Sequence, residues 1–411
     1  MHNPTKHRWM TLLIVAVVLL AGAMAHADVI TDWNSTACDI AVAAKLGTAF
    51  CYRVLAMVQS AVYEAVNAIT KRYPPERVPL DAAPGASVEA AVAAANRATL
   101  LQLVPSQQAA IDSASQTALS TIAESPAKTA GLAVGDKAAA AILTLRADDG
   151  ATAAESYRPY TTAGVYVPTV IPAIPQWPQR KPWVMTSANQ FRPGPPPSLT
   201  SDLWARDYNE IKALGAKNST QRSAEQTDIA RFWADIGSLI YFPVVRSVAT
   251  APGREATQNA RLLAVAAQAI DDAFIAVFDA KYHYNFWRPI TAIRNGDIDG
   301  NDATERDASW LPFIDTPMHP EYPCAHCIES AAVGAVLQAE IGTGPTPTLS
   351  TTSLTAPGMV RSWTQIGDFV QEVAHARIYD GVHYRNSTEV GTAMGKQIGE
   401  LAAAKYLQPR K

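Results

Sequence analysis

The sequence has little charge and no strong excess of either sign. Asp, Glu, Lys and Arg make up only 17% of its 411 residues, and the formal net charge is −3. This balance gives no reason to expect nucleic acid or an anionic membrane surface as a partner. Hydrophobic residues make up 48%, so the chain can fill a sizeable core, and its length suggests two or three domains.

Long apolar runs are absent except near the N-terminus. Residues 1–27 combine a basic start, an apolar run and a small-x-small end, at 6–8, 10–24 and 25–27. This form predicts a secretory signal peptide, cleaved before Asp28, and therefore a periplasmic or extracellular protein. A membrane anchor is the alternative, but the run is shorter than the roughly 20 residues of a membrane span. We expect no membrane association after cleavage.

Alternating strand patterns and internal repeats are also absent. Apolar residues recur at helical spacing instead. They predict helices over 39–69, 86–104, 106–123, 127–145, 203–214, 224–233, 254–284, 328–341, 360–378 and 388–406. The pattern that begins near 254 leaves open an extension to Ile293. We expect an all-α protein of two packed helical bundles, residues 28–156 and 202–411, with the functional site in the second.

A proline-rich segment separates the two bundles. Residues 157–201 contain ten prolines between Pro159 and Pro197, which exclude a long helix or a central strand. The segment also contains several aromatic residues, which disordered segments usually lack. We therefore predict an extended strap that packs along the outside of the bundle.

Cysteines are few. The four are Cys38, Cys51, Cys324 and Cys327, and an exported protein can oxidise them. Local pairing would join Cys38 to Cys51 and Cys324 to Cys327, with packed thiols as the alternative. On one continuous helix the first pair would be about 20 Å apart, so that pairing requires a bend, for which Gly47 is the candidate.

Three short segments near the C-terminus carry most of the chemistry. They contain Lys281 and Arg288, then His326, then Arg377 and His383. Three fixed cations and two imidazoles suit a tetrahedral oxyanion such as phosphate or vanadate better than a metal cation. A zinc site is disfavoured because the cations would repel the metal and the histidine spacing matches no usual ligand pattern.

The predicted helices place these groups. Lys281 and Arg288 are seven residues apart, so on one helix they would face the same way. We expect His326 and His383 just ahead of two helix N-termini, where free N–H groups favour a bound anion, with Asn386 as a candidate N-cap.

The three segments resemble the signature Lys-x6-Arg-Pro, Pro-Ser-Gly-His and Ser-Arg-x5-His. Type 2 phosphatidic acid phosphatases, bacterial class A acid phosphatases and vanadium-dependent haloperoxidases share this signature. The resemblance covers residues 281–387, and a weaker likeness to exported bacterial haloperoxidase-like proteins extends to 53–69. It implies the all-α fold of that superfamily and an oxyanion site.

By this resemblance, His383 would bind vanadium or act as a nucleophile that becomes phosphohistidine. Lys281, Arg288 and Arg377 would balance the charge of the oxyanion, together with the segment that holds Cys324 and Ala325. His326 would be the acid–base residue. The implied cofactor is vanadate, or none if the protein is a phosphatase.

Two features resemble the haloperoxidase branch in particular. They are residues 286–289 in the first segment and 319–323 ahead of the second. His319 falls where related haloperoxidases have an aromatic residue or a histidine near the halide, although a surface turn is equally compatible. Trp233 is a candidate aromatic wall near the halide, with helix packing as its alternative role.

Two departures from the signature weaken the expected site. Cys324 and Ala325 replace Ser-Gly, and a thiol is a poorer hydrogen-bond donor than a hydroxyl. Ser387, beside Asn386, stands where the family usually has an Asp that orients the catalytic histidine. Unless another carboxylate substitutes, the imidazole loses basicity.

The favoured function is a vanadate-dependent haloperoxidase that oxidises bromide or iodide with hydrogen peroxide. An exported acid phosphatase acting on phosphomonoesters is the first alternative. A non-catalytic oxyanion-binding relative is the second, supported by the Cys324 and Ser387 departures. A lipid phosphatase is disfavoured because the sequence has no further apolar spans. The oligomeric state stays open, a homo-oligomer included.

Overall fold

The structure is a computed structural model, and it describes residues 28–74, 77–235 and 240–406. The predicted signal peptide lies outside the described residues. The rest is mostly helical, which confirms the all-α prediction. No helix within the described ranges is both long enough and apolar enough to cross a membrane.

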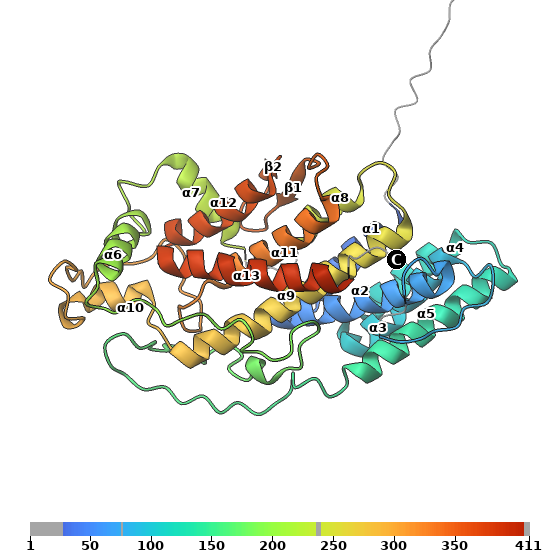
Figure 1. Cartoon of the computed structure of the whole chain (residues 1–411), viewed down its shortest axis with the longest axis horizontal. Helices are drawn as coiled ribbons and strands as arrows, with labels where there is room; N and C mark the ends of the chain where they lie inside the picture. Colours follow the sequence, from blue (N-terminus) through green and yellow to red (C-terminus); the bar gives the residue numbers. More distant parts are fainter. Residues whose placement is uncertain (1–27, 75–76, 236–239, 407–411) are drawn as a thin grey trace, which may run out of the picture.

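The N-terminal helices form one end of the molecule (Figure 1). They are α1 Val29–Ala43, α2 Thr48–Thr70, α3 Val88–Leu103, the 3-10 turn η1 Pro105–Gln107, α4 Gln108–Ser120 and α5 Pro126–Leu145. Helix α3 packs against both α2 and α5. The approach of α5 to α3 depends on Gly135, where a Cβ atom would lie 2.3 Å from the Ala91 carbonyl oxygen.

The chain bends between α1 and α2, so the single helix predicted over 39–69 is wrong. Residues 44–47 separate the two helices, and Gly47 is the N-cap of α2. The bend falls at the predicted place, but the Cys38–Cys51 disulfide is not formed. None of the four cysteines forms a disulfide, and the Cys51 thiol donates to the Ala41 carbonyl at 3.5 Å.

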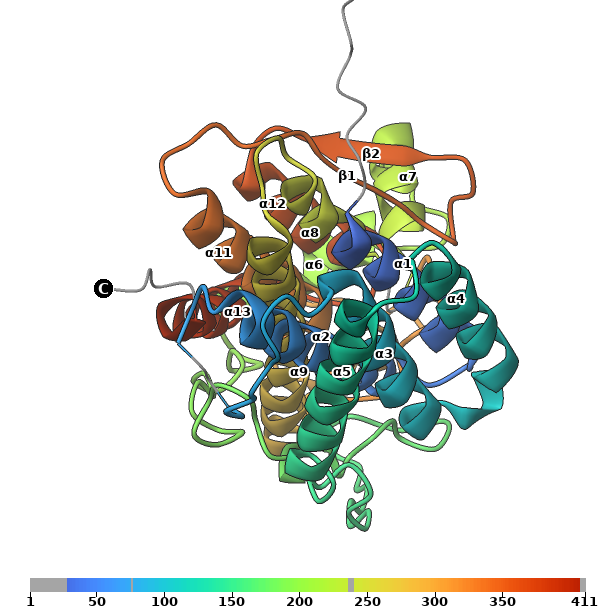
Figure 2. The same ribbon diagram turned by 90° about the vertical axis from the view of Figure 1, so that its right-hand side faces the viewer.

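The C-terminal bundle is built on the 29-residue helix α9, Ala256–Tyr284. Its other elements are α6 Asp202–Leu214, α7 Ala224–Trp233, α8 Phe242–Ala249, α10 Pro289–Arg294, η3 Gly296–Ile298, α11 Ala325–Ile341, α12 Ile366–Tyr379 and α13 Arg385–Tyr406. Helix α11 packs closely on α13 and α9, and α9 also packs on α2, so one hydrophobic core runs through both bundles. Figure 2 shows α2 and α9 between α13 and α3.

The contact between α11 and α13 depends on small residues. At Gly391, Gly395 and Gly399 of α13, a Cβ atom would lie 2.6, 2.0 and 2.3 Å from carbonyl oxygens of α11 or its N-cap. These glycines recur every fourth residue and therefore lie on one face of the helix. Their lack of side chains lets the two backbones touch, which brings the start of α13 up to the start of α11.

Helix α9 ends at Tyr284, as predicted. The extension toward Ile293 that the pattern left open does not form, because Asn285 takes a left-handed conformation with φ of 51°. The boundary predicted at residue 360 is wrong. The segment predicted as a helix over 360–378 begins as strand β2, Val360–Trp363, which pairs antiparallel with β1, Leu349–Thr352. Helix α12 starts only at Ile366.

The proline-rich strap is confirmed. Residues 157–201 have no regular structure except a short 3-10 turn, η2 Trp177–Gln179. The buried carboxylate of Asp272 on α9 accepts hydrogen bonds from three successive strap amides, those of Trp183, Val184 and Met185, at 2.6, 2.8 and 3.0 Å. These bonds satisfy backbone groups that would otherwise be buried without partners.

Candidate functional site

The fold brings the three motif segments to one place. Lys281 lies in the last turn of α9, Arg288 is the N-cap of α10, and Arg377 lies in the last turn of α12. His326 lies in the first turn of α11, and His383 lies between α12 and α13. The three cations are no more than 1% exposed, so their charges sit in the interior of the protein.

The first segment is arranged differently from the prediction. Lys281 and Arg288 do not share a helix, because the left-handed Asn285 ends α9 between them. Asn tolerates this conformation better than most residues. The chain then turns, and Pro289 begins α10 at a position where a missing N–H costs nothing. The two cations converge because of this turn and not because of helical periodicity.

Two of the buried cations bind only backbone oxygens and imidazole nitrogen. Lys281 Nζ donates to the carbonyls of Pro320 and Glu321 at 3.0 and 2.8 Å. Arg288 donates to the carbonyls of His319 and Val382 at 2.9 and 2.8 Å. Burial lowers the pKa of Arg288 to about 10 and, with the charge of Arg288, lowers the pKa of Lys281 well below its usual value. Neither of these two cations has a carboxylate partner among the described residues.

The third cation has donors to spare. Arg377 Nη1 donates to the Trp233 carbonyl at 2.9 Å and to Asp380 Oδ2 at 2.7 Å. Its Nε and Nη2 are buried and have no partner among the described residues. A buried N–H group without an acceptor costs about 1–3 kcal/mol. Unpartnered guanidinium donors in a cationic site can bind the oxygens of an oxyanion. The residues present therefore fit a vanadate or phosphate group.

His383 is oriented by a carboxylate that the sequence did not reveal. Its Nδ1 lies 2.8 Å from Glu321 Oε1, which also accepts the Tyr384 amide at 3.1 Å. With its proton on Nδ1, the ring presents a lone pair on Nε2, which lies 3.3 Å from Arg288 Nη1. Ser387 Oγ is 3.5 Å from Nδ1. Glu321 thus supplies the carboxylate that the Ser387 position lacks.

The charge states around His383 are set by burial. Burial and the nearby charges of Arg288, Lys281 and Arg377 lower the pKa of His383 well below its usual value. The imidazole is therefore neutral, as a metal ligand or nucleophile must be. Burial raises the pKa of Glu321 to about 7, against the opposing effect of Lys281 and Arg288.

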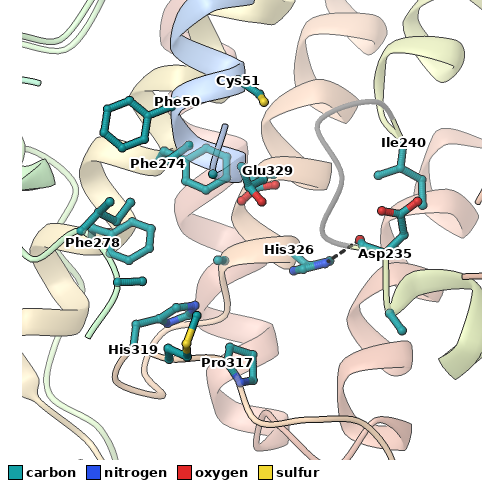
Figure 3. Close-up of a pocket in the computed structure, with 18 of the residues that line it drawn as sticks. Phe50, Cys51, Asp235, Ile240, Phe274, Phe278, Pro317, His319, His326 and Glu329 are labelled. Carbon is teal, nitrogen blue, oxygen red and sulfur yellow. Dashed lines mark hydrogen bonds between the residues drawn. The ribbon is translucent and has the colours of Figure 1, made fainter. Parts of the chain in front are cut away.

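His326 faces the cations from α11. Its Nε2 lies 3.3 Å from the Asp235 carbonyl (Figure 3). Burial and the charge of Arg377 lower the pKa of His326 well below its usual value. The residue was expected just ahead of its helix, but α11 begins at Ala325. A neutral imidazole at this place can take up or release a proton during a reaction.

Cys324 is the N-cap of α11. Its sulfur accepts the Cys327 amide at 3.3 Å, and the two cysteines are packed thiols with no disulfide. Burial opposes ionisation, but the hydrogen bond from the Cys327 thiol and the charges of Arg377 and Lys281 together lower the pKa of Cys324. Ala325 follows it and faces the same cavity as His326.

A cavity of about 820 Å³ adjoins these groups and is lined by Arg377, His383 and His326 among others. His319 also lines it. The His319 ring packs edge-on against Phe278 with centroids 5.2 Å apart, and its Nδ1 lies 2.9 Å from Arg288 Nη2. His319 is thus part of the interior site and not of a surface turn.

Two candidate residues, Trp233 and Asn386, have roles other than the aromatic wall and the N-cap predicted for them. The Trp233 ring belongs to a buried aromatic cluster with Tyr241, Trp363 and Phe369. Of the two roles predicted for Trp233, packing between helices fits this position better than an aromatic wall near the halide. Asn386 is not the N-cap of α13, because that helix begins at Arg385. The Asn386 amide donates to Asp207 at 2.7 Å.

The described part of the chain contains no cluster of three or more His, Cys, Asp or Glu side chains that could hold a metal cation. The ionisable groups that converge here are mostly cationic or neutral. The arrangement can therefore bind a multiply charged oxyanion, place a neutral imidazole on it through His383, and exchange protons through His326.

Comparisons with known proteins show what the chain is similar to. Residues 261–411 match the family model of the VCPO second helical-bundle domain. Vanadium chloroperoxidase of Curvularia inaequalis is 28% identical over 179 residues, which cover 36% of this chain and 29% of that protein. The chain therefore aligns with less than a third of that relative.

Solved structures share the fold over nearly the whole chain. A bacterial vanadium-dependent iodoperoxidase superposes with a TM-score of 0.77 at 23% identity and covers 92% of this chain and 96% of its own. A bacterial vanadium-dependent chloroperoxidase in its apo form superposes with a TM-score of 0.69 at 16% identity, covering 88% of this chain and 94% of its own. At these identities the likeness shows the fold.

Proposed function

We propose that the chain is a member of the vanadium-dependent haloperoxidase superfamily and that it oxidises a halide with hydrogen peroxide at a vanadate bound to His383. One observation carries this proposal. The neutral His383 imidazole is tied through Nδ1 to Glu321 and presents Nε2 beside Arg288. In the same site, two Arg377 nitrogens, Nε and Nη2, have no acceptor among the described residues. Such a site supplies both a ligand and compensating charge for an oxyanion.

Each residue of the site then has a role. Lys281, Arg288 and Arg377 would hold the vanadate oxygens, and His383 Nε2 would bind the vanadium. When bound, vanadate supplies a Lewis-acidic centre that activates hydrogen peroxide toward a halide ion. His326 would accept and return protons from the cavity side, because its ring lines the cavity and is neutral.

Glu321 acts through His383. Its carboxylate holds the Nδ1 proton, which keeps Nε2 free and raises its basicity. Outer partners of this kind typically change metal affinity by about 10–100-fold. We therefore expect that Glu321→Gln lowers vanadate affinity by about that factor and that Glu321 offsets the loss at Ser387.

The halide is proposed to be bromide or iodide. His319 lies against Phe278 and Arg288 on the cavity side, where it can contact a large, polarisable anion. The similar fold of a bacterial iodoperoxidase is compatible with iodide. Burial and the charges of Lys281 and Arg288 lower the pKa of His319, so the ring adds no charge of its own to a halide site.

The deciding experiment measures vanadium retained per chain after incubation with orthovanadate and gel filtration, with bromide and iodide oxidation assayed on the same sample. We expect one vanadium per chain and peroxide-dependent oxidation of at least one halide. His383→Ala should lose both, whereas His375→Ala, a half-buried histidine on α12 outside the site, should keep both.

The same experiment separates the alternatives. Hydrolysis of a simple phosphomonoester by vanadate-free protein, with no retained vanadium, would make the protein an acid phosphatase that uses His383 as nucleophile. Tight vanadate binding without turnover of halide or phosphomonoester would make it a non-catalytic oxyanion-binding relative. Either result would contradict the haloperoxidase proposal.

A further inference from the structure

The cavity beside the site is much larger than the proposed inorganic substrates. Its volume of about 820 Å³ compares with on the order of 30 Å³ for a molecule of the size of water. It extends from Arg377 and His383 to the turn between α1 and α2 and to the strap at Ile174. Its volume falls in the roughly 300–1,000 Å³ range of sites for organic ligands.

Most of the cavity wall is apolar. Away from the cations it is formed by side chains from α2, α9, the strap and the end of the segment before α8, which include Phe50, Ile174, Ile240, Phe274 and Phe278. Such a wall stabilises a buried hydrocarbon or aromatic group by about 25 cal/mol for each Å² removed from water. It offers nothing to a halide or to peroxide.

One polar group interrupts this wall. Glu329 lies on α11 one turn beyond His326 and lines the cavity although it is only 4% exposed. Figure 3 shows its side chain directed into the space bounded by Phe274, Phe278 and His326. Among the described residues no hydrogen bond or ion pair satisfies its carboxyl group, and the proposed halide chemistry gives it no role.

The carboxyl group of Glu329 is neutral in this setting. Burial raises its pKa well above the usual value. A protonated carboxyl group has one O–H donor and an accepting oxygen. It therefore matches a ligand group that can both donate and accept, such as a hydroxyl, and leaving it unpaired costs about 1–3 kcal/mol.

We propose that this cavity binds the organic acceptor of the halogen, an apolar phenol or enol whose hydroxyl hydrogen-bonds to Glu329. This inference rests on the proposed haloperoxidase function. The apolar body lies on the phenylalanine side of the cavity, and its electron-rich carbon faces the end where Arg377 and His383 open into it. The acceptor is then halogenated in place and not by hypohalous acid in solution.

The reaction balances as R–H + X⁻ + H₂O₂ + H⁺ → R–X + 2 H₂O. The halide is oxidised and both peroxide oxygens are reduced to water. A carbon–halogen bond forms at the ring or enol carbon, and the carbon–hydrogen bond breaks with loss of a proton, for which His326 is the neutral base nearest to Glu329 along α11.

Binding can be tested without vanadate, halide or peroxide, which separates this inference from the proposed function. Calorimetric titration of the folded, vanadate-free protein would use phenol, 4-ethylphenol and 4-butylphenol, and then 4-butylanisole, in which a methyl ether replaces the hydroxyl. We expect affinity to rise up to about fourfold for each added methylene. The phenol should bind about five- to tenfold more tightly than its ether.

Two matched pairs of variants assign the site. Glu329→Leu should abolish the preference of phenol over ether, whereas Glu329→Gln, which keeps a donor and an acceptor, should retain it. Leu46→Trp, which fills the cavity at the α1–α2 turn, should weaken binding of 4-butylphenol at least tenfold. Leu145→Trp, at a partly exposed position on α5 outside the cavity, should leave it unchanged.

Three outcomes would overturn the inference. They are no binding of any phenol by folded protein, an unchanged phenol-to-ether ratio in Glu329→Leu, and equal effects of Leu46→Trp and Leu145→Trp. Halide oxidation with a small acceptor, measured on the same preparation, separates the two proposals. Phenol binding without halide oxidation would support the organic site while contradicting the haloperoxidase function.

Discussion

Two buried groups of cations lie along α9, and they are neutralised in different ways. The first, the arginine–aspartate cluster, consists of Arg53, Arg146 and Arg180 with Asp149 and Asp271. Asp149 lies 2.8 Å from both Arg53 and Arg180, and Arg180 lies 2.5 Å from Asp271. The cluster joins α2, the end of α5 and the strap to α9.

The second group, the cationic site, consists of Lys281, Arg288 and Arg377. Among the described residues, Arg377 alone of the three has a carboxylate partner, Asp380, and its Nε and Nη2 have no acceptor there. Lys281 and Arg288 bind carbonyl oxygens and a histidine nitrogen instead. The comparison teaches that charges matched within the chain hold the fold together, whereas unmatched buried charges mark the place where a ligand completes the structure.

The largest expected effect is on stability at the arginine–aspartate cluster. Asp271→Ala removes one of the two carboxylates that bind the buried Arg180 guanidinium and leaves the Trp183 indole N–H without its acceptor. We expect the free energy of unfolding to fall by about 3–5 kcal/mol, measured by urea denaturation. Asp228→Ala, which breaks an exposed pair with Arg231, should change it by less than about 0.5 kcal/mol. A loss below 1 kcal/mol for Asp271→Ala would remove the distinction between the two groups.

The second prediction is that removing a cation from the cationic site lowers ligand affinity and does not lower stability. Lys281→Met removes a buried charge that has no carboxylate partner, so stability should be unchanged or higher. Vanadate affinity should fall about 100-fold, or about 2.7 kcal/mol, measured by equilibrium dialysis. Lys396→Met, at an exposed position on α13, should change neither quantity. Destabilisation of Lys281→Met similar to that of Asp271→Ala would show that the cation is structural.

The third prediction is that the two groups respond to pH with opposite sign. Although burial opposes it, the bonds and charges of Arg53 and Arg180 lower the pKa of Asp149 from 3.8 to about 2. Its contribution is therefore present above pH 4 and is lost as the pH falls toward 2. Burial raises the pKa of Glu321 from 4.5 to about 7. The unfolded chain releases this proton first, so stability falls as the pH rises from about 4.5 to 7.

Denaturation of vanadate-free protein between pH 2 and 8 measures both slopes. We expect Glu321 to account for a loss on the order of 2 kcal/mol between pH 4.5 and 7. Asp380, whose pKa burial also raises to about 7, should add to it. Glu321→Gln should reduce this fall in the free energy of unfolding. It should leave the loss of stability between pH 4 and pH 2 unchanged. If Glu321→Gln has the same pH dependence of the free energy of unfolding as the parent protein, Glu321 is ionised in the folded protein between pH 4.5 and 7.

The smallest expected effect concerns the sulfur that borders the cationic site. Cys324→Ser replaces a weak donor by a hydroxyl and keeps an N-cap acceptor for the Cys327 amide. Vanadate affinity should rise by about fivefold, or about 1 kcal/mol, and peroxide should no longer oxidise this position. Cys327→Ser serves as the control, and equal affinities in both variants would show that residue 324 does not contact the oxyanion.

The residue types of the site could be read from the sequence because each is defined by its own side chain and by short spacings. The carboxylate that pairs with His383 could not be read from the sequence. Glu321 stands 62 residues before His383, and nothing local distinguishes it from a surface glutamate. Only the turn before α11 and the start of α13, held together by the glycines of α13, bring the two into contact.

A periodic pattern alone does not decide where a helix begins or ends. The apolar spacing of α9 continues past Tyr284, but Asn285 takes a left-handed conformation and ends the helix. Residues 360–363 read as part of a helix, yet they pair with Leu349–Thr352, a contact between segments that local propensity does not predict.

The sequence by itself determined that the protein is helical, that a proline-rich strap follows the first bundle, and that three segments carry cations and imidazoles. These properties follow from helical periodicity, from the restrictions of proline and from side-chain chemistry, all of which are local. The tertiary structure alone decided that Lys281 and Arg288 have no carboxylate partner among the described residues, that Glu321 replaces the missing acid, and that Glu329 faces an apolar cavity. Burial, charge balance and cavity volume depend on which distant segments pack together, and only the folded chain specifies that.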